Sequence, residues 1–411
     1  MLKLPNEEKS YWREVYSESL YSSLANDLEI DVAIIGGGIT GLTSAYLLKR
    51  SGLKVAVLEK DTIGAGTTGR TTGKVTAQHG LIYHDLQGRL GNRTAQIYGE
   101  ANQAAVEQIA DIVKNEKIKD VFYRSDNYVF TDESNKIEDF KREAAMAQAL
   151  GLPATFETDA PLPFNIKAAV KFANQGQLHS QKYLLGLARF IHGNGSHVFE
   201  NSRVTGIRDG NPGQVRTSQA SVMAKDIIVA TNVPTLPLMA RGGYCLLEYP
   251  TESYIIAGQS ERKWEGMYIS PDKHHYSILP VNNGSQQLLL IGGEGHISGL
   301  RGSKAARYKR LADYAQQNFG ITSVQYRWSD RDYLAYDYVP LIGKLYPWSK
   351  HLYVGSAFKK WGLSNGTVAA IILHDLITGQ DNRWTDIFTP NRLKPVLSIP
   401  RVAAKYIFRK Q

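Results

Sequence analysis

With 411 residues, 43% of them hydrophobic and 21% charged, the chain has the composition of a folded protein with two or more domains, which excludes intrinsic disorder. The formal net charge of +9 is not accompanied by a nucleic-acid-binding motif, so we expect no nucleic-acid partner. No stretch reaches the roughly 18 apolar residues that a membrane span needs, and the N-terminus lacks the apolar core of a secretion signal, which indicates a cytoplasmic protein.

Residues 31–58 have the pattern of a βαβ unit. Residues 31–35 predict a buried strand, residues 39–50 repeat apolar side chains with a period near 3.6, and residues 54–58 predict a second strand. The turn before the helix has the spacing G-x-G-x-x-G, which provides a tight turn, a close approach for a pyrophosphate and close packing of helix on strand. The first N–H groups of such a helix bind phosphate. The three glycines are Gly36, Gly38 and Gly41.

An acid ends the second strand of this unit. Glu59 lies 18 residues after Gly41, where a carboxylate can accept hydrogen bonds from an adenosine ribose. The glycines, the flanking strands and this acid together predict a dinucleotide site rather than a glycine-rich structural turn. Further contacts are predicted from Ile39, Thr40 and Lys60.

A polar run follows in residues 61–80, "DTIGAGTTGRTTGKVTAQHG". It is rich in glycine and threonine, and a chain does not ordinarily bury such a stretch for packing. We therefore expect residues 67–80 to wrap an oxygen-rich, charged ligand with hydroxyl and backbone N–H groups; the alternative is a solvated loop. Enzymes that use NAD seldom need a second cradle of this kind, which favours another dinucleotide.

Two later segments also predict ligand contacts. Residues 202–232 predict strands separated by turns, and the last strand ends where the main chain of Ala230 and Thr231 can approach the adenosine end of the ligand. Residues 352–354 predict a strand, and Gly362 to Gly366 open an apolar helix. The positive N-terminus of that helix suits the anionic pyrimidine side of a reduced flavin.

Two inserted blocks predict a second domain. Residues 83–187 contain two amphipathic helical segments and a strand-like segment, whereas residues 244–326 alternate apolar and polar side chains, which is typical of an antiparallel sheet that would form the substrate pocket. His274 and His275 are adjacent on such a strand and point to opposite faces, so at most one can line the pocket and we expect no metal site. The single cysteine, Cys245, predicts a small buried apolar residue rather than a reactive thiol.

The C-terminus is predicted to be a basic tail, residues 391–411. Between residue 383 and the end there are seven basic residues and one acidic residue. Because apolar side chains are mixed with these cations, the tail could lie on an anionic membrane surface or on an acidic partner; the alternative is a solvated terminal helix.

Several of these motifs carry a family resemblance. The chain resembles the FAD-dependent D-amino-acid oxidase superfamily, the group of glycine, sarcosine and γ-glutamylputrescine oxidases, from "SYWRE" near the N-terminus to "FTPNRLKPV". More narrowly, it is similar to bacterial members whose flavoprotein part is followed by a Rieske iron–sulfur domain. A Rieske centre needs two cysteines, so with one cysteine we expect no such domain in these residues. The more specific motifs are "KVTAQHG", "NQGQLHSQKYL", "EGMYIS", "IGGEGH", "DYVPLIG" and "KKWGLSNGT".

The resemblance implies an α/β fold: a GR2-type Rossmann-like FAD-binding domain and a discontinuous α+β substrate domain on an antiparallel sheet. The FAD-binding domain would comprise residues 1–82, 188–243 and 327–390, and the substrate domain residues 83–187 and 244–326. The glycines would then hold the FAD pyrophosphate and Glu59 the ribose. Other implied FAD contacts are Gly66, Thr67, Thr68, Arg70, Thr72, Lys74, Val204, Gly362, Leu363 and Ser364.

The resemblance also implies the chemistry. In amine-oxidising relatives a hydride passes from the carbon of a C–N bond to flavin N5, and the protein supplies orientation, charge and a dry cavity. The substrate would be a small amine or amino acid, and the electron acceptor O2 or another molecule. Cations could bind an anionic substrate or help oxygen react. The candidates for catalysis are Lys74, His79, Lys360 and Trp361, beside Arg70 and Lys359 as further cations; surface, structural or packing roles are the alternatives.

Two departures from the family pattern limit this transfer. The position of the carboxylate-binding lysine of sarcosine oxidases falls on Gly362, so the substrate need not be a simple α-amino acid. The positions of covalent flavin attachment in some relatives are Arg70 and Asp330, so we expect non-covalent FAD. The alternative functions are an NAD(P)H-linked reductase and a non-catalytic electron-transfer flavoprotein that docks to a partner or a membrane.

Overall fold

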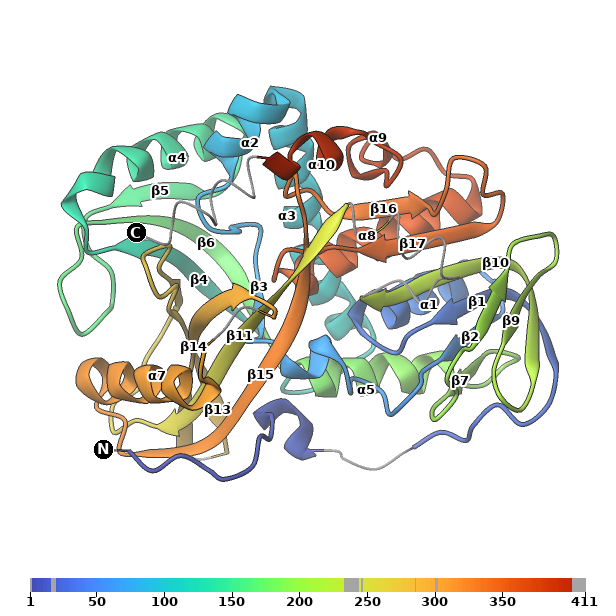
Figure 1. The fold of residues 1–411 in the computed structure, drawn as a ribbon, viewed down its shortest axis with the longest axis horizontal. Coiled ribbons are helices and arrows are strands. Elements are labelled where there is room, and N and C mark those ends of the chain that lie inside the picture. Colours follow the sequence, from blue (N-terminus) through green and yellow to red (C-terminus); the bar gives the residue numbers. More distant parts are fainter. Residues whose placement is uncertain are drawn as a thin grey trace. The chain divides into compact units, whose positions relative to one another are not determined.

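Figure 1 shows the computed structural model of the chain, which describes residues 2–15, 20–232, 244, 247–284, 286–299 and 302–400. Cys245 and residues 401–411, about half of the predicted basic tail, lie outside the described residues. The chain divides into two compact units. Unit 1 comprises Met1–Val15, Gly69–Ser180 and Thr251–Arg331, and unit 2 comprises Tyr16–Thr68, Gln181–Pro250 and Asp332–Gln411.

Unit 2 is built on one sheet with the strand order β16-β17-β10-β1-β2-β7, extended beside β10 by β9 and β8. The neighbours β17, β10, β1, β2 and β7 are parallel, as expected for a βαβ unit, and α1 and α8 pack against each other. The elements are β1 (Leu28–Ile35), α1 (Ile39–Arg50), β2 (Val55–Leu58), α5 (Ser180–Ile191), β7 (His197–Phe199), β8 (Gly206–Arg208), β9 (Gly213–Arg216), β10 (Ser221–Asn232), β16 (Leu341–Lys344), β17 (Leu352–Ser356), α8 (Gly362–Thr378), α9 (Thr385–Phe388) and α10 (Lys394–Leu397).

The register of the parallel strands brings their carboxyl ends to one edge. Ile35 of β1 lies opposite Leu58 of β2 and Val229 of β10, and Asn232 of β10 lies opposite Ser356 of β17. β1 and β2 are buried along most of their length, as their continuous apolar runs predict. Ligands of open parallel sheets bind at this edge, so the register places the segments that follow these strands in the position of a binding site.

Unit 1 is built on a second sheet with the strand order β15-β11-β14-β13-β12-β4-β6-β3, and β5 pairs with β6. The pairs β11–β14, β14–β13, β13–β12, β4–β6, β6–β3 and β5–β6 are antiparallel and β12–β4 is parallel, so the antiparallel sheet predicted for residues 244–326 is confirmed. The elements are η1 (Tyr11–Val15), β3 (Lys74–Val75), α2 (Tyr83–Leu90), α3 (Asn92–Asn115), β4 (Phe122–Thr131), η3 (Ser134–Lys136), α4 (Ile137–Ala149), β5 (Ala154–Glu157), β6 (Ala168–Leu178), β11 (Glu248–Gln259), β12 (Met267–Ile269), β13 (Ser277–Asn283), β14 (Gln286–Ile297), α7 (Lys304–Phe319) and β15 (Ser323–Ala335); η2 (Thr67–Arg70) spans the boundary of the units.

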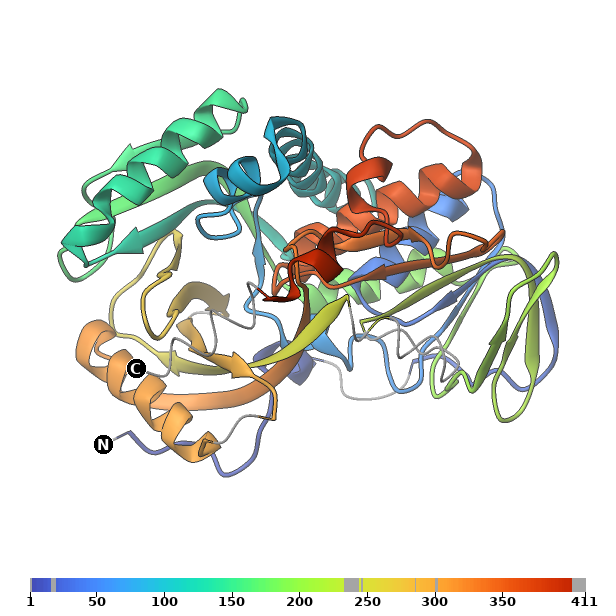
Figure 2. The ribbon, with the colours of Figure 1, turned by 45° about the horizontal axis from the view of Figure 1, so that its top comes forward.

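Both faces of this second sheet are covered, because successive side chains of a strand point to opposite faces. Ile256 of β11 packs with Leu311 of α7, the helix that lies against the sheet in Figure 2. The neighbouring Ile255 packs on the other face with Tyr11 and Trp12 of η1. The alternation in the sequence therefore reflects two apolar clusters rather than one buried and one solvated face.

The boundaries of the units differ from the predicted domain boundaries. Residues 69–82 belong to unit 1 because Lys74 and Val75 pair with β6, and because Trp12 Nε1 donates a hydrogen bond of 2.6 Å to the carbonyl of Thr71. Residues 1–15 also belong to unit 1, where Lys9 pairs with Arg327. The other boundaries shift by five to seven residues, to 180/181, 250/251 and 331/332.

The described part of the C-terminal segment is anchored in unit 2 rather than separate from it. Arg392 forms a bidentate ion pair with the buried carboxylate of Asp337, at 2.8 and 2.9 Å.

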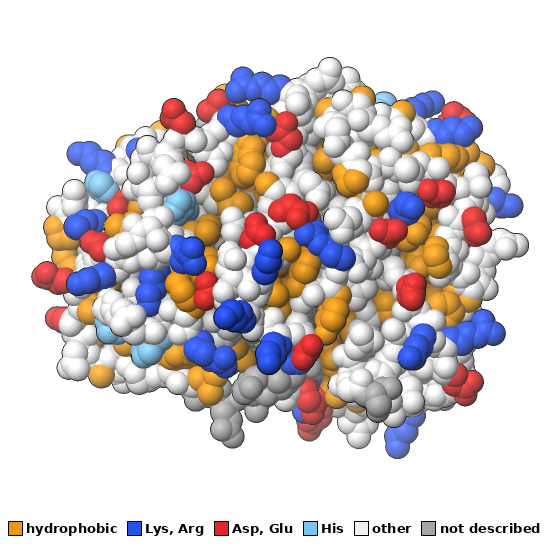
Figure 3. Space-filling view, turned by 180° about the vertical axis from the view of Figure 1, so that it is seen from behind, with side chains coloured by type: hydrophobic (Ala, Val, Ile, Leu, Met, Phe, Trp, Pro, Cys, Tyr) orange, Lys and Arg blue, Asp and Glu red, His pale blue; other side chains and the backbone are white. Residues whose placement is uncertain are grey.

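Among the described residues, no helix combines the length and apolar character that crossing a bilayer requires. The face drawn in Figure 3 intersperses Lys and Arg with Asp and Glu.

Candidate functional site

Two of the three motif glycines are required by the fold itself. Gly36 has a φ of +114°, and a Cβ there would lie 2.5 Å from the carbonyl oxygen of Ala230. A Cβ on Gly41 would lie 2.0 Å from the carbonyl oxygen of Gly36. At Gly38, by contrast, a Cβ would meet only Thr68 Oγ1, at 3.1 Å. The backbone at Gly38 is therefore open to a close-lying group, as phosphate binding requires.

The start of α1 offers hydrogen-bonding groups to an anion. Gly38 is its N-cap and supplies no side-chain cap, and the Ile39 N–H donates to Thr68 Oγ1 at 3.1 Å. Thr40 Oγ1 is buried and forms no hydrogen bond with the described residues. A helix N-terminus carries a partial positive charge, so this arrangement fits the phosphates of a dinucleotide.

Glu59 is fixed by backbone N–H groups at the end of β2. Its Oε2 accepts from the Gly37 N–H at 2.8 Å and its Oε1 from the Asp61 N–H at 2.9 Å, and the residue is 9% exposed. Each carboxylate oxygen keeps a second acceptor position for a ribose hydroxyl. Lys60 is exposed and forms an ion pair with Asp61, so its side chain is held at the surface.

The other predicted contacts in unit 2 lie near the same strand ends. Thr67 Oγ1 accepts a hydrogen bond of 3.1 Å from Asn232 Nδ2, and Ala230 and Thr231 are half-buried at the end of β10. Gly66 is exposed, and a Cβ there would meet nothing within 4 Å, so its own conformation does not require glycine. Val204 is buried two residues after Ser202, whose N–H donates to the Glu59 carbonyl.

A second helix start whose N-cap residue supplies no side-chain cap lies beside the first. Trp361 is the N-cap of α8 and has no side-chain cap, and Gly362, Leu363 and Ser364 form the first turn. A Cβ on Gly366 would lie 2.8 Å from Ile39 Cγ2 and from Thr40 Oγ1, so the first turn of α1 closely contacts α8 just after the first turn of α8. The two positive helix ends thus meet at one edge of the sheet.

The loop before α8 has an unusual backbone. Ala357, Lys359 and Lys360 have φ values of 63°, 54° and 66°, a region that non-glycine residues rarely adopt. Asp332 holds this loop, because its buried carboxylate accepts a short hydrogen bond from the Lys360 N–H and another from Tyr333. Strained backbone of this kind is concentrated at binding and catalytic sites.

The side chain of Lys360 is exposed, yet desolvation by the surrounding protein lowers its pKa, while the charge of Asp332 opposes that shift. Burial raises the pKa of Asp332 in turn. Lys359 is half-buried, with its Nζ 4.7 Å from the centre of the Tyr338 ring.

The second half of the polar run is buried, which contradicts the expectation that such a stretch is not buried for packing. Residues 73–79 are buried in unit 1, and their polar groups have partners there. Gln175 Oε1 accepts from Thr76 Oγ1 and from the Ala77 N–H, both at 2.8 Å, and Gln78 Nε2 donates to the Val170 carbonyl at 2.7 Å. The sheet supplies these partners, so polarity alone did not indicate solvent or ligand contact.

Two of the predicted catalytic residues lie in this buried half. Lys74 Nζ donates to the Tyr268 carbonyl at 2.8 Å and to Ser277 Oγ, and burial lowers its pKa to about 7. His79 bonds Tyr98 through Nδ1 at 2.6 Å and the Thr76 carbonyl through Nε2 at 2.9 Å. Both ring nitrogens are engaged, which fits the structural alternative for His79. Arg70 is exposed and Thr72 half-buried in the same unit.

Neither histidine of the predicted pair stands out as a ligand-binding group. His274 Nδ1 lies 2.8 Å from the buried carboxylate of Glu294, which also accepts from Arg310. His275 has a φ of 49° in the turn between β12 and β13. No pattern in the sequence indicated Glu294, because its partners lie on a turn and on helix α7, 13 or more residues away along the chain.

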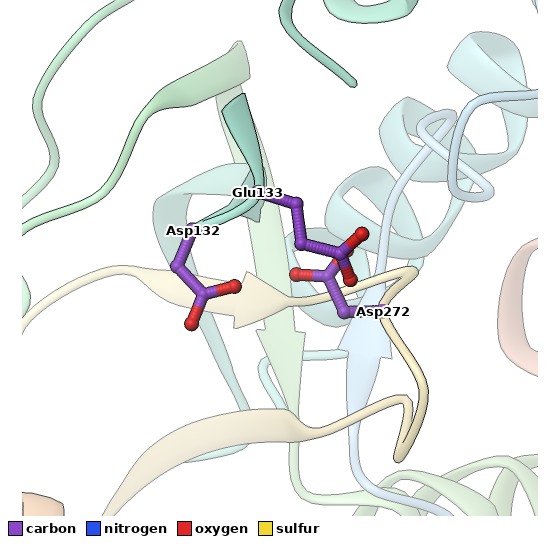
Figure 4. A group of neighbouring side chains, drawn as sticks. All are labelled: Asp132, Glu133 and Asp272. Atoms are coloured by element: carbon purple, nitrogen blue, oxygen red, sulfur yellow. The ribbon is translucent and has the colours of Figure 1, made fainter. Parts of the chain in front are cut away.

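One group of three carboxylates within the described residues has ligand atoms within 4.8 Å of one another: Asp132, Glu133 and Asp272, drawn in Figure 4. The ammonium group of Lys136 lies 2.9 Å from Glu133 and 2.5 Å from Asp272, and Thr131 Oγ1 donates to Asp272. These partners account for the cluster as an ion-pair network, and a cluster of acids alone does not indicate a metal site.

Comparison with known proteins gives the family. Residues 31–376 match the family model DAO, described as FAD dependent oxidoreductase. The chain belongs to this family. It is 32% identical over 409 residues to the putative Rieske 2Fe-2S iron-sulfur protein YhfW of Bacillus subtilis (strain 168), an alignment that covers 98% of this chain and 80% of that one. It is therefore an FAD-dependent oxidoreductase, and the predicted cofactor is confirmed.

More distant relatives agree with this assignment. The γ-glutamylputrescine oxidoreductase of Escherichia coli (strain K12) is 25% identical over 385 residues, with 89% of this chain and 87% of that one covered. The crystal structure of glycine oxidase from Geobacillus kaustophilus superposes with a TM-score of 0.75 at 19% identity, over 89% of this chain and 99% of that one. L-proline dehydrogenase from P. horikoshii has a TM-score of 0.73 at 18% identity, over 90% and 98%. The predicted α/β flavoenzyme fold is confirmed.

Proposed function

We propose that the protein oxidises a C–N bond of a small amine or amino acid. The observation that carries the proposal is that α1 and α8, two helices whose N-cap residues supply no side-chain cap, begin at the carboxyl edge of the parallel sheet and contact each other near their starts in a DAO-family chain. The relatives named as a γ-glutamylputrescine oxidoreductase, a glycine oxidase and an L-proline dehydrogenase support the substrate class.

Unit 2 would hold the cofactor through the following groups. The backbone from Gly36 to Gly41 and Thr40 Oγ1 would meet the pyrophosphate, and Glu59 the ribose. The first turn of α8, Gly362 to Ser364, would meet the flavin ring system. Non-covalent attachment is part of the proposal, because neither Arg70 nor Asp330 has a side chain that attaches flavin in the covalent relatives. The sequence-predicted contacts of Arg70, Thr72, Lys74 and Val204 stay predictions.

When bound, FAD would supply the hydride acceptor and the redox chemistry. The residues of this chain orient and polarise. Lys360 and Trp361 precede α8 directly, so they are the catalytic candidates that the structure leaves accessible: Lys360 is exposed and Trp361 half-buried. While it is protonated, the Lys360 ammonium group can bind a carboxylate or stabilise developing negative charge. The neutral amine does both less well, and a lowered pKa brings its loss of the proton closer to neutral pH.

Anaerobic reduction of the purified yellow protein tests this function. Addition of a panel of primary and secondary amines and amino acids is expected to bleach the flavin absorbance near about 450 nm with at least one of them. The matching 2-hydroxy acids, which lack the C–N bond, serve as the control and should not bleach it. Reduction by dithionite but by no amine would contradict the proposal and favour an electron-transfer flavoprotein.

A docking role of the C-terminus stays a proposal of its own. The described part of the tail, residues 391–400, exposes Leu393 and Leu397 at 75% and 71%. Apolar side chains among cations are typical of segments that lie on anionic membranes. Sedimentation with vesicles that contain phosphatidylserine tests it, with neutral vesicles as the control; equal sedimentation with both would contradict it.

A further inference from the structure

Asn232, at the end of β10, connects segments that are distant in the sequence. Its Nδ2 donates to Thr67 Oγ1 at 3.1 Å, and its carbonyl accepts from Ser356 Oγ at 2.9 Å. Ser356 ends β17 and lies 2.7 Å from Glu248 Oε2. Thr68, the residue after Thr67, accepts a hydrogen bond from the N–H of Ile39 at the start of α1. These hydrogen bonds, joined by the covalent chain at Thr67–Thr68 and within Asn232, form one series of contacts from the start of α1 to Glu248.

The number of protons in this series determines the state of Glu248. A serine hydroxyl has one proton, and a backbone carbonyl can only accept. If Ser356 donates to the Asn232 carbonyl, its contact with Glu248 is a hydrogen bond only when the carboxyl group is protonated and donates to Ser356 Oγ. A neutral glutamic acid satisfies both short contacts, whereas a carboxylate leaves one of them without a proton.

The surroundings of Glu248 agree with a neutral acid. Glu248 is 5% exposed, and burial raises its pKa to about 8, with a further contribution from the charge of Asp332; donation by Ser356 to the ionised carboxylate, the other use of its single proton, opposes the shift. Tyr244 also faces Glu248, and burial raises the pKa of that phenol well above its ordinary value. Lys360 interacts with the carboxylate of Asp332. Within the described residues no cation is in ion-pair contact with Glu248.

The position of Ser356 gives this protonation a structural consequence. Ser356 directly precedes the loop in which Ala357, Lys359 and Lys360 have left-handed backbones, and that loop leads into α8. Asn232 is itself left-handed, with a φ of 64°. Such backbones are retained only where neighbouring contacts hold them. The Ser356 contacts hold the ends of β10 and β17 together where these strained segments begin.

We propose that Glu248, in its neutral acid form, is a positioning residue for the FAD site, and that FAD affinity falls when Glu248 loses its proton. This inference rests on the proposed FAD contacts of α1, Thr67, Thr68 and α8. Loss of the proton breaks one hydrogen bond of the series, so part of the free energy of FAD binding must then be used to order the loop. By linkage, bound FAD raises the affinity of Glu248 for its proton.

Measurement of FAD affinity between pH 6.5 and 9.0 tests the inference. The apoprotein is titrated with FAD, and binding is followed by quenching of flavin fluorescence. For the wild type we expect the dissociation constant to rise about fivefold across this range, the factor that corresponds to one neutral hydrogen bond. Glu248→Gln keeps a donor for Ser356 Oγ at every pH, so its affinity should change less than about twofold over the same range.

Two further variants separate this role from general effects. Glu252→Gln replaces another carboxylate of β11, which pairs with Lys304, and should keep the wild-type pH profile. Ser356→Ala removes the middle of the series, so it should bind FAD more weakly at pH 6.5 and show no rise with pH. If Glu248→Gln does not fold, the pH profile of Ser356→Ala still tests the role of Glu248.

The outcomes are distinguishable. A wild type that binds no FAD even at pH 6.5 contradicts the proposed FAD site and this inference with it. Tight binding at pH 6.5 with equal affinity at pH 9.0, or a Glu248→Gln profile that parallels the wild type, overturns the role of Glu248 alone.

Discussion

The two halves of the polar run, residues 61–68 in unit 2 and residues 69–80 in unit 1, have similar compositions but different surroundings. Thr67 and Thr68 are half-buried and bond the strand ends and the helix start that form the candidate FAD site. Residues 73–79 are buried and bond strands of the second sheet. Polarity in a sequence thus indicates that partners are needed, but whether a ligand or the fold supplies them depends on the strands nearby.

The largest effect is expected for Gly41→Ala in unit 2. The new Cβ would lie 2.0 Å from the Gly36 carbonyl oxygen, so α1 must move away from the glycine turn. We expect a loss of about 3 kcal/mol or more in unfolding free energy, and purification without yellow colour. Gly88→Ala is the matched control, because a Cβ there meets nothing within 4 Å in helix α2. A yellow Gly41→Ala protein of normal stability would contradict the described packing.

Lys74→Met tests the buried half of the run through the pH dependence of stability. The pKa of Lys74 is about 7 when folded and about 10.4 when unfolded, so between these values the unfolded state binds more protons and stability rises with pH. This group should add about 1.4 kcal/mol per pH unit, a slope that the methionine removes. Urea unfolding at pH 7.5, 8.5 and 9.5 measures it.

The exposed Lys141→Met is the control for this experiment and should leave the slope unchanged. An unchanged slope in Lys74→Met would show that the amine is charged in the folded protein, and the buried half would then resemble a ligand-binding segment more than a structural one.

Thr68→Val tests the first half of the run at nearly constant side-chain volume. It removes the acceptor of the Ile39 N–H at the start of α1, so FAD affinity should fall about fivefold, the equivalent of one hydrogen bond. Thr155→Val on β5 removes an exposed hydroxyl far along the chain and should leave FAD affinity unchanged. Equal affinities for Thr68→Val and the wild type would mean that the first half does not organise the helix start.

The smallest effect is expected for Arg70→Ala, at the junction of the two halves. The Arg70 side chain is exposed, and its structural contact is made by its carbonyl, which accepts from Trp328 Nε1 at 2.8 Å. Exposed charges contribute little, so FAD affinity should change about threefold or less. A loss above about tenfold would show that the guanidinium contacts the cofactor phosphates and that the second half takes part in binding.

The sequence by itself determined the elements that depend on local patterns. The strand at residues 31–35, the helix at 39–50, the glycine turn and the acid after the second strand form one continuous segment, so spacing alone predicts them. The helix that begins at Gly362 and the alternating strands of residues 244–326 follow from the same kind of pattern.

Only the tertiary structure decided which polar side chains are satisfied by the fold. Ser356 lies more than 100 residues along the chain from both of its partners, Asn232 and Glu248. These contacts arise from the register of β10 with β17 and from the position of the start of β11. The burial of Lys74 and His79 likewise depends on β3 joining β6. Strand pairing is non-local, so no spacing in the sequence encodes these partners, and a buried polar group reveals its role only when the atoms that satisfy it are known.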